Sequence, residues 1–198
     1  MEHTVHAAML IVTAVSVART GWVLVGLLRT LARPSASVDV TWDLAVFLVA
    51  PEMVLPAVAA LWLFHGDWMD PPYSLARTMG ALFGACLALG GLALTIWSWV
   101  SLPSVGTGHY LLEGQSLVTN GAYAVVRHPI YSGAFMIWFG LAAAYTSAAI
   151  LGLTALYVIP AYVLSIMGEE QMMLSRYGRA YLEYRQRVGA FVPHIGRA

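Results

Sequence analysis

Long apolar stretches dominate this chain, and they constrain its fold more than any other feature. The first three are Val5 to about Leu28, Asp43–His65 and Leu75–Leu102. Each is about as long as the ~20 residues that a helix needs to cross a bilayer. Of all residues 60% are hydrophobic and 10% are charged, whereas soluble domains contain about 25% charged residues. We therefore expect an integral, multi-pass membrane protein in contact with membrane lipid.

Two more apolar stretches, Ile130–Tyr145 and Ser147–Met167, follow each other almost directly and predict a tight helical hairpin. The residues after Met167 are amphipathic, which predicts a small peripheral helical cap. The pattern as a whole predicts one domain over residues 1–198. Its fold class is all-α, with about five transmembrane helices and a C-terminal helical cap. The lone cysteine, Cys86, lies in an apolar run and is expected to be a buried packing residue.

The basic residues are informative because all ten are arginines, and they balance ten acidic residues. This balance gives no reason to expect nucleic acid as a partner. Cytoplasmic loops carry an excess of arginine, which predicts an outside N-terminus and a cytoplasmic C-terminus and cap. The first residues, MEHTVH, lack the positive charge of a signal peptide, so the first stretch is expected to be retained. On this topology Arg77 lies at the outer face. The cytoplasmic arginines are Arg29, Arg33, Arg127, Arg176, Arg179, Arg185, Arg187 and Arg197.

Polar residues gather at the start of the fourth apolar stretch, in the segment LVTNGAYAVVRHPIYSG (Leu117–Gly133). Pro129 suits the first turn of a helix, because its missing N–H would have no partner there. Arg127 and His128 lie at the mouth of this helix start, where free amide groups can bind an electron-rich group. The alternative is an anchor at the helix start, with Arg127 on lipid phosphate and Tyr131 at the headgroup level. These residues alone favour the anchor.

Glu169 and Glu170 form an acidic pair at the end of the fifth apolar stretch. Neighbouring helical residues point about 100° apart, so one carboxylate can face the interior while the other faces water. A carboxylate accepts two parallel hydrogen bonds, which suits a ribose diol or an ammonium group. The alternative is a solvated helix end. Acids oppose the dipole at a C-terminal end, so we expect the helix to continue into Gln171–Tyr177.

Glu52 lies near the middle of the second apolar stretch. A charged carboxylate in hydrocarbon costs at least ~2.5 kcal/mol on insertion scales. Two interpretations are therefore open: a functional carboxylate on the path of a lipophilic substrate, or a structural one that is protonated or paired with Arg19. In the cap, Tyr177, Tyr181 and Tyr184 recur at near-helical spacing, which favours packing against the membrane surface over a binding site.

Taken in order, these motifs resemble the isoprenylcysteine carboxyl methyltransferase family and its phospholipid methyltransferase relatives. The resemblance covers about residues 106–193 and rests on LVTNGAYAVVRHPIYSG, the hydrophobic hairpin, the acidic pair, YGRAYLEYRQRV and Phe191-Val192-Pro193. It implies a membrane methyltransferase that uses S-adenosylmethionine and acts on a lipophilic small molecule or a lipid-anchored substrate. Residues 1–102 would then be a three-helix anchor, and residues 103–198 the cofactor-binding catalytic region.

The resemblance also implies site residues. The cofactor-binding positions are Gln115, Ser116, Leu117, Val118, Tyr123, His128, Pro129, Ile130, Tyr131 and Glu169. We assign His128, Tyr131 and Glu170 as catalytic candidates, Glu52 and Ser165 as substrate candidates, and no metal ligand. Ser165 stands where the isoprenylcysteine enzymes have an arginine that would hold a substrate carboxylate, which disfavours a prenylcysteine carboxylate as acceptor. Gln115 stands where the family often has a histidine.

Two other classes of protein compete with this assignment. Membrane sterol and quinone-type reductases carry a similar RHPxY element and use a nicotinamide cofactor, but they are usually longer and have more spans. A non-catalytic membrane scaffold could retain a degenerate pocket. The presence of Tyr123, His128, Tyr131 and Glu169 argues against such a loss of cofactor binding.

Overall fold

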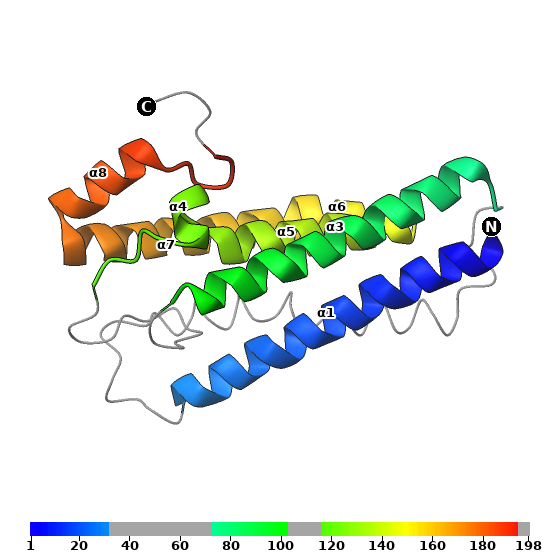
Figure 1. Cartoon of the computed structure of the whole chain (residues 1–198), viewed down its shortest axis with the longest axis horizontal. Coiled ribbons are helices and arrows are strands. Elements are labelled where there is room, and N and C mark those ends of the chain that lie inside the picture. The colour runs from blue at the N-terminus through cyan, green and yellow to red at the C-terminus, as the bar shows by residue number, and fades with distance from the viewer. Residues whose placement is uncertain (32–72, 103–115, 194–198) are drawn as a thin grey trace.

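The computed structural model describes residues 1–31, 73–102 and 116–193, and each named element in these ranges is a helix (Figure 1). In chain order these are α1 (Glu2–Leu31), α3 (Leu75–Val100), α4 (Ala122–Val125), α5 (Pro129–Ala144), α6 (Ala148–Leu153), the π-helical η3 (Thr154–Val158), α7 (Ile159–Tyr177) and α8 (Arg179–Arg187). Within these ranges, Val126 and Gly189 form an isolated parallel β-bridge. The predicted all-α fold class is confirmed for this part of the chain.

Three helical runs in the described ranges are apolar and long enough to cross a membrane: Glu2–Val25, Leu75–Val100 and Ala148–Tyr177. They confirm helices in the first, third and fifth apolar stretches. α5 is apolar but has 16 residues, fewer than the ~20 that usually span a bilayer. The predicted span Asp43–His65 lies outside the described residues. The described part thus has three long membrane helices and one shorter apolar helix.

The last long run is one continuous helix built from α6, η3 and α7. The π-helical η3 ends at Val158, two residues before Pro160, whose ring would collide with the carbonyl of Leu156 in a regular α-helix. A π-helical turn at this point accommodates the proline without ending the helix. The helix extends beyond the apolar stretch that ends at Met167, because α7 continues to Tyr177. This continuation confirms the expectation drawn from the helix dipole.

α3 and α5 pack closely because glycines face each other across their interface. A Cβ atom on Gly91 would lie 2.5 Å from the carbonyl oxygen of Gly133. One on Gly140 would lie 2.6 Å from the carbonyl oxygen of Gly84. Small residues at such positions let membrane helices approach each other and gain van der Waals contact. The glycines therefore bring α5, on which the candidate site begins, against α3.

The other face of α3 is apolar and exposed, and Phe83 and Cys86 lie on it. The expectation that Cys86 is buried is wrong. An apolar run in a soluble protein points to burial, but a membrane helix is apolar on its outer face as well as on the face that packs.

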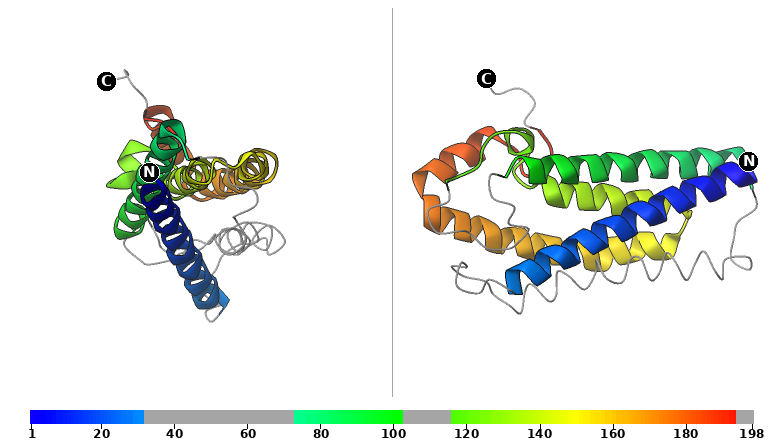
Figure 2. Two further views of the ribbon diagram at one scale, coloured as in Figure 1. Left: turned by 90° about the vertical axis from the view of Figure 1, so that its right-hand side faces the viewer. Right: turned by 60° about the horizontal axis from the view of Figure 1, so that its bottom comes forward.

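The predicted hairpin is confirmed, with α5 and α6 joined by residues 145–147 (Figures 1 and 2). Thr146 adopts a left-handed conformation with φ 50°. The Ser147 side chain caps α6 by accepting a 3.2 Å hydrogen bond from the Ile150 amide. The hydroxyl of Tyr145 lies 2.7 Å from Oγ1 of Thr13 on α1. The chain thus reverses sharply, and the end of α7 returns to the level at which α5 starts.

The two ends of the helical bundle differ in chemistry. At one end α1 meets the start of α3, where Nε2 of His6 lies 3.2 Å from the hydroxyl of Tyr73 and the Arg77 guanidinium lies 4.7 Å from the Tyr73 ring centre. At the other end α4, the start of α5, the end of α7 and α8 come together (Figures 1 and 2). These elements and the residues between them carry five of the arginines that the topology groups together: Arg127, Arg176, Arg179, Arg185 and Arg187.

Candidate functional site

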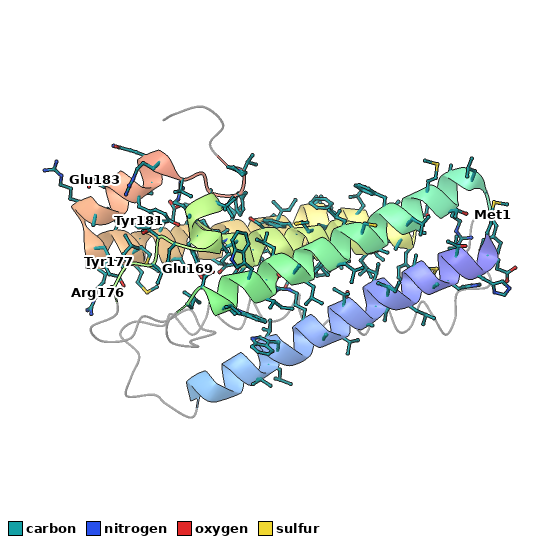
Figure 3. All side chains as sticks on the ribbon, in the orientation of Figure 1. Met1, Glu169, Arg176, Tyr177, Tyr181 and Glu183 are labelled. Atoms are coloured by element: carbon teal, nitrogen blue, oxygen red, sulfur yellow. The ribbon has the colours of Figure 1, made fainter. Side chains whose placement is uncertain are left out.

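The start of α5 and the second half of α7 carry the polar residues that the sequence singled out. His128 is the N-cap residue of α5 and Pro129 begins the helix, as the missing proline N–H predicts. Because α5 and α7 are the two arms of the hairpin, Glu169 and Glu170 come to lie beside this helix start. Figure 3 shows Glu169 at this end of the bundle and Met1 at the opposite end.

Glu169 faces the first turn of α5. The hydroxyl of Tyr131 donates a 2.6 Å hydrogen bond to Oε1 of Glu169, and Nδ1 of His128 lies 3.8 Å from Oε2. Tyr131 and His128 are buried, whereas the Glu169 side chain keeps 22% of its surface exposed. Two ring residues, Tyr131 and His128, therefore hold this carboxylate beside the start of α5.

Glu170 is the centre of an ion-pair network. Its Oε1 accepts hydrogen bonds from Nη2 of Arg127 at 2.8 Å and from Nε at 3.2 Å. Nε2 of His128 lies 3.2 Å from the same oxygen, and Nη2 of Arg185 lies 3.6 Å from Oε2. The expectation that one of the paired carboxylates faces water is wrong. Both are largely buried, because the start of α5 and helix α8 flank α7 at this level.

Arg127 also binds the C-terminal end of α8. Its Nη1 donates hydrogen bonds to the carbonyl oxygens of Val188 at 2.5 Å and of Arg185 at 3.3 Å. Its backbone amide donates to the carbonyl oxygen of Gly189 at 2.8 Å. One arginine thus connects the approach to α5 with two helices that follow much later in the sequence: α7, through Glu170, and the end of α8.

An aromatic group borders the polar cluster. The His128 amide donates a 3.1 Å hydrogen bond to the carbonyl oxygen of Ala190, and the next residue, Phe191, has its ring centre 6.2 Å from that of His128. Phe135 lies 5.6 Å from Phe191 and 5.3 Å from Tyr162, in edge-to-face arrangements. These rings give the cluster an apolar wall on the side of α5 and of the C-terminal segment.

The tyrosines of α4 and α8 lock these two short helices together. The hydroxyl of Tyr184 donates a 2.7 Å hydrogen bond to the carbonyl oxygen of Tyr123. Burial raises the pKa of Tyr184, and burial together with the charge of Glu169 raises the pKa of Tyr123. Tyr181 is buried too. The tyrosine stripe therefore packs, as expected, but against the protein for Tyr181 and Tyr184 and not against the membrane surface.

Ser165 lies one helical turn before Glu169 on α7. It is 1% exposed, and its hydroxyl donates a 2.7 Å hydrogen bond to the carbonyl oxygen of Ala161. The residue is therefore a neutral part of the helix interior at the level of the cluster.

The structure brings five of the predicted positions together: Tyr123, His128, Pro129, Tyr131 and Glu169, with Glu170 beside them. Ile130 is half-buried in the first turn of α5. Ser116 is exposed, and Leu117 and Val118 are half-buried, in the segment before α4. Gln115 and Glu52 lie outside the described residues.

Sequence reasoning missed the contacts that Arg127 and Arg185 make around this cluster. It placed Arg127 on lipid phosphate or at the helix mouth and gave Arg185 no partner. A signal was present in the segment YGRAYLEYRQRV, where Tyr181, Tyr184 and Arg185 fall on one helical face. That face packs on α4 and α7.

The cluster can bind and orient a ligand that carries a diol or a positive charge. It offers a carboxylate held by a hydroxyl, an imidazole that can take a proton, and an aromatic wall. Among residues 1–31, 73–102 and 116–193 there is no group of three or more His, Cys, Asp or Glu side chains that could hold a metal ion.

Comparison with known proteins identifies relatives of two kinds. The chain is 31% identical to the nickel-cobalt-cadmium resistance protein NccN of Alcaligenes xylosoxydans xylosoxydans over 146 residues, which is 72% of this chain and 62% of that protein. It is 29% identical to the cobalt-zinc-cadmium resistance protein CzcN of Cupriavidus metallidurans, over 67% of this chain and 54% of that protein. It is also 39% identical to protein-S-isoprenylcysteine O-methyltransferase of Tribolium castaneum, over 40% of this chain and 28% of that protein.

The chain therefore spans about half to two thirds of the length of the first two relatives and a smaller part of the third. The sequence model of the phospholipid methyltransferase family matches residues 79–180, which include most of α3, all of α5, the hairpin and the acidic pair. This match covers more than half of the chain, and so the protein belongs to the phospholipid methyltransferase family.

Proposed function

We propose that this protein is an integral membrane methyltransferase that uses S-adenosylmethionine to methylate a lipophilic acceptor. The observation that carries the proposal is the cluster of His128, Tyr131 and Glu169, which lies within the family match and joins the two arms of the hairpin. The acceptor is a small lipophilic molecule or a lipid-anchored group. It would reach the cluster from the bilayer, past the aromatic wall of Phe135 and Tyr162.

The residues of the cluster fit the cofactor by their chemistry. S-adenosylmethionine supplies a methyl group on a positively charged sulfur, so transfer requires no nucleophilic side chain. The Glu169 carboxylate, oriented by the Tyr131 hydroxyl, can accept hydrogen bonds from a ribose diol or an ammonium group. The hydroxyl of Tyr123 lies close enough to this carboxylate to be affected by its charge. The segment 115–118 would complete the binding site.

The chain's part in the reaction is to position the acceptor and to manage its proton. A thiolate or carboxylate acceptor can react directly once it is aligned with the methyl group. An amine must first lose a proton, which His128 can take at one of its ring nitrogens. Ser165 offers no cation for an acceptor carboxylate, and this favours amines, thiols and neutral lipids. Glu170 binds arginines, which supports a role in holding the site together.

The proposed topology places this cluster on the cytoplasmic side and the N-terminus outside. Residues 1–102 would anchor the protein in the membrane, and residues 103–198 would form the cofactor-binding catalytic region. Five of the described arginines, Arg127, Arg176, Arg179, Arg185 and Arg187, lie at the same end as the cluster, which supports this orientation.

Calorimetric titration of the detergent-purified protein with S-adenosylmethionine and S-adenosylhomocysteine tests the proposal. We expect saturable binding to the wild type and its loss in Glu169→Gln. The matched control is Glu183→Gln, which makes the same change in an exposed pair with Arg179 on α8. No binding to well-folded wild type would contradict the proposal, and binding of a nicotinamide cofactor instead would favour a membrane reductase. An equal loss of cofactor binding in Glu169→Gln and Glu183→Gln would show that Glu169 has no specific role in binding the cofactor.

A further inference from the structure

The C-terminal segment Val188–Phe191 lies across the approach to α5 and reaches the ring of His128. We propose that Arg127 is a positioning residue that fastens this segment, and through it Phe191, as a cover on the His128 side of the cofactor site. The inference rests on the proposed function, because it assigns the cover to the site of S-adenosylmethionine.

The Arg127 side chain is 10% exposed, and its contacts use both the side and the end of the guanidinium group. Nε and Nη2 bind one oxygen of Glu170, while Nη1 binds the carbonyl oxygens of Val188 and Arg185. Only a planar guanidinium presents donors in this forked arrangement, because a lysine ammonium is a single point of charge. Arg127 is therefore matched to its partners by shape as well as by charge.

The carbonyl oxygens that Arg127 binds belong to the C-terminal end of α8. The last carbonyls of a helix have no intrahelical partner, and the helix dipole makes this end negative. A cation there satisfies these groups and stabilises the end of the helix. Arg127 thus caps α8 from a distant part of the sequence, and Glu170 balances the charge that remains.

The backbone contacts of the segment are too few to hold it alone. Within the described residues, the Val188 amide bonds the Tyr184 carbonyl of α8, and the segment meets the approach to α5 through an isolated bridge and hydrogen bonds from the Arg127 amide to Gly189 and from the His128 amide to Ala190. Isolated two-stranded pairings are at best marginally stable in water. The side chain of Arg127 supplies the missing attachment, at the point where α8 ends and the segment begins.

The consequence for the site lies at Phe191. Its ring approaches both His128 and Phe135, and its position depends on the attachment of the residues just before it. Release of the segment would remove this ring and admit water to the imidazole and to Glu169. Hydrogen bonds and ion pairs to a bound cofactor weaken when water competes for them. Loss of Arg127 should therefore reduce cofactor affinity, although Arg127 does not touch the proposed cofactor-binding carboxylate.

The test uses Arg127→Lys and Glu170→Gln in the full chain, with Glu183→Gln as the control at an exposed pair. The first readout needs no ligand: trypsin cleavage after Arg187, at the base of the segment, relative to cleavage after the exposed Arg176 of α7. We expect both site variants to raise this ratio roughly tenfold, because hydrogen bonds to charged groups contribute about that much. Glu183→Gln should leave it as in the wild type.

The second readout is calorimetric binding of S-adenosylhomocysteine. We expect roughly tenfold weaker binding in Arg127→Lys. Phe191→Ala, which leaves the attachment intact, should weaken binding without raising cleavage after Arg187. Unchanged cleavage and unchanged affinity in Arg127→Lys would overturn the inference while wild-type binding upholds the proposed function. A wild type that binds no cofactor would overturn the proposed function, and with it the assignment of the cover to a cofactor site.

Discussion

The hydroxyl of Tyr131 and the carboxylate of Glu169 are joined by a 2.6 Å hydrogen bond across 38 positions of sequence. This contact connects the first turn of α5 with α7 and closes the open end of the hairpin inside the proposed cofactor site. The ring of Tyr131 is held separately, by edge-to-face packing on Tyr162 at 5.3 Å. The hydroxyl and the ring can therefore be tested independently.

Tyr131→Phe removes the hydroxyl and keeps the ring. We expect the dissociation constant for S-adenosylmethionine to rise roughly tenfold or more, because a hydrogen bond to a charged group contributes ~1.5–3 kcal/mol. Calorimetry measures this change. The control is Tyr145→Phe, which removes another buried hydroxyl, 2.7 Å from Thr13 Oγ1 at the far end of α5. It should lower the unfolding temperature and leave affinity unchanged. A similar loss of affinity in both variants would argue against a specific role of Tyr131.

The close packing of α3 and α5 predicts a large effect of a single methyl group. In Gly140→Ala the new Cβ would lie 2.6 Å from the carbonyl oxygen of Gly84. Backbone cannot move aside as a side chain can, so we expect a loss of ~1–3 kcal/mol or more in unfolding free energy. Gly152→Ala is the control, since no atom lies within 4 Å of its Cβ position. It should be neutral or stabilising by up to ~1 kcal/mol. Equal unfolding curves of Gly140→Ala and Gly152→Ala in detergent would contradict the close packing of α3 on α5.

The docking of α8 should depend on alkaline pH. Burial, and then the charge of Glu170, raises the pKa of Tyr181 from 10.0 to about 12. A pKa that is higher in the folded than in the unfolded state contributes stability that is complete below pH 10 and is lost as the pH rises through about 12. Tyr181→Phe should remove this part of the alkaline loss of stability.

The ultraviolet absorbance of tyrosinate follows the ionisation directly. The wild type should show a late-titrating step that Tyr181→Phe reduces and that the exposed-site variant Tyr73→Phe retains. If the late step is the same in wild type and Tyr181→Phe, the burial of the Tyr181 side chain of α8 is not what delays ionisation.

The helices and the hairpin could be predicted because they depend on patterns along the chain. Apolar stretches of the right length predicted α1 and α3, and Pro129 marked the start of α5. The acidic pair at Glu169–Glu170 correctly predicted that α7 continues. Each of these inferences uses neighbours within a few residues, where helical geometry fixes what faces what.

The contacts that organise the site could not be predicted in this way. Arg127 finds its partners 43 positions away on Glu170 and 61 positions away on Val188. No local pattern says which of the ten arginines will meet these groups. The orientation of both carboxylates also depends on α8 folding back over α7. The resemblance led to the right residues, and the structure adds why they are held where they are.

Met1 and Glu183 lie at opposite ends of the helical bundle (Figure 3). We therefore expect them on opposite sides of the membrane. The test places a single cysteine at His3 or at Glu183 in a Cys86→Ser background, because Cys86 is itself exposed. Both positions are exposed, His3 in the first turn of α1 and Glu183 on α8. An impermeant maleimide should label Glu183→Cys in inside-out vesicles and His3→Cys in right-side-out vesicles, since the arginine-rich end faces the cytoplasm. Labelling of both positions from one side would refute the proposed topology, and reversed labelling would place the Glu169 cluster on the outer face, away from cytoplasmic S-adenosylmethionine.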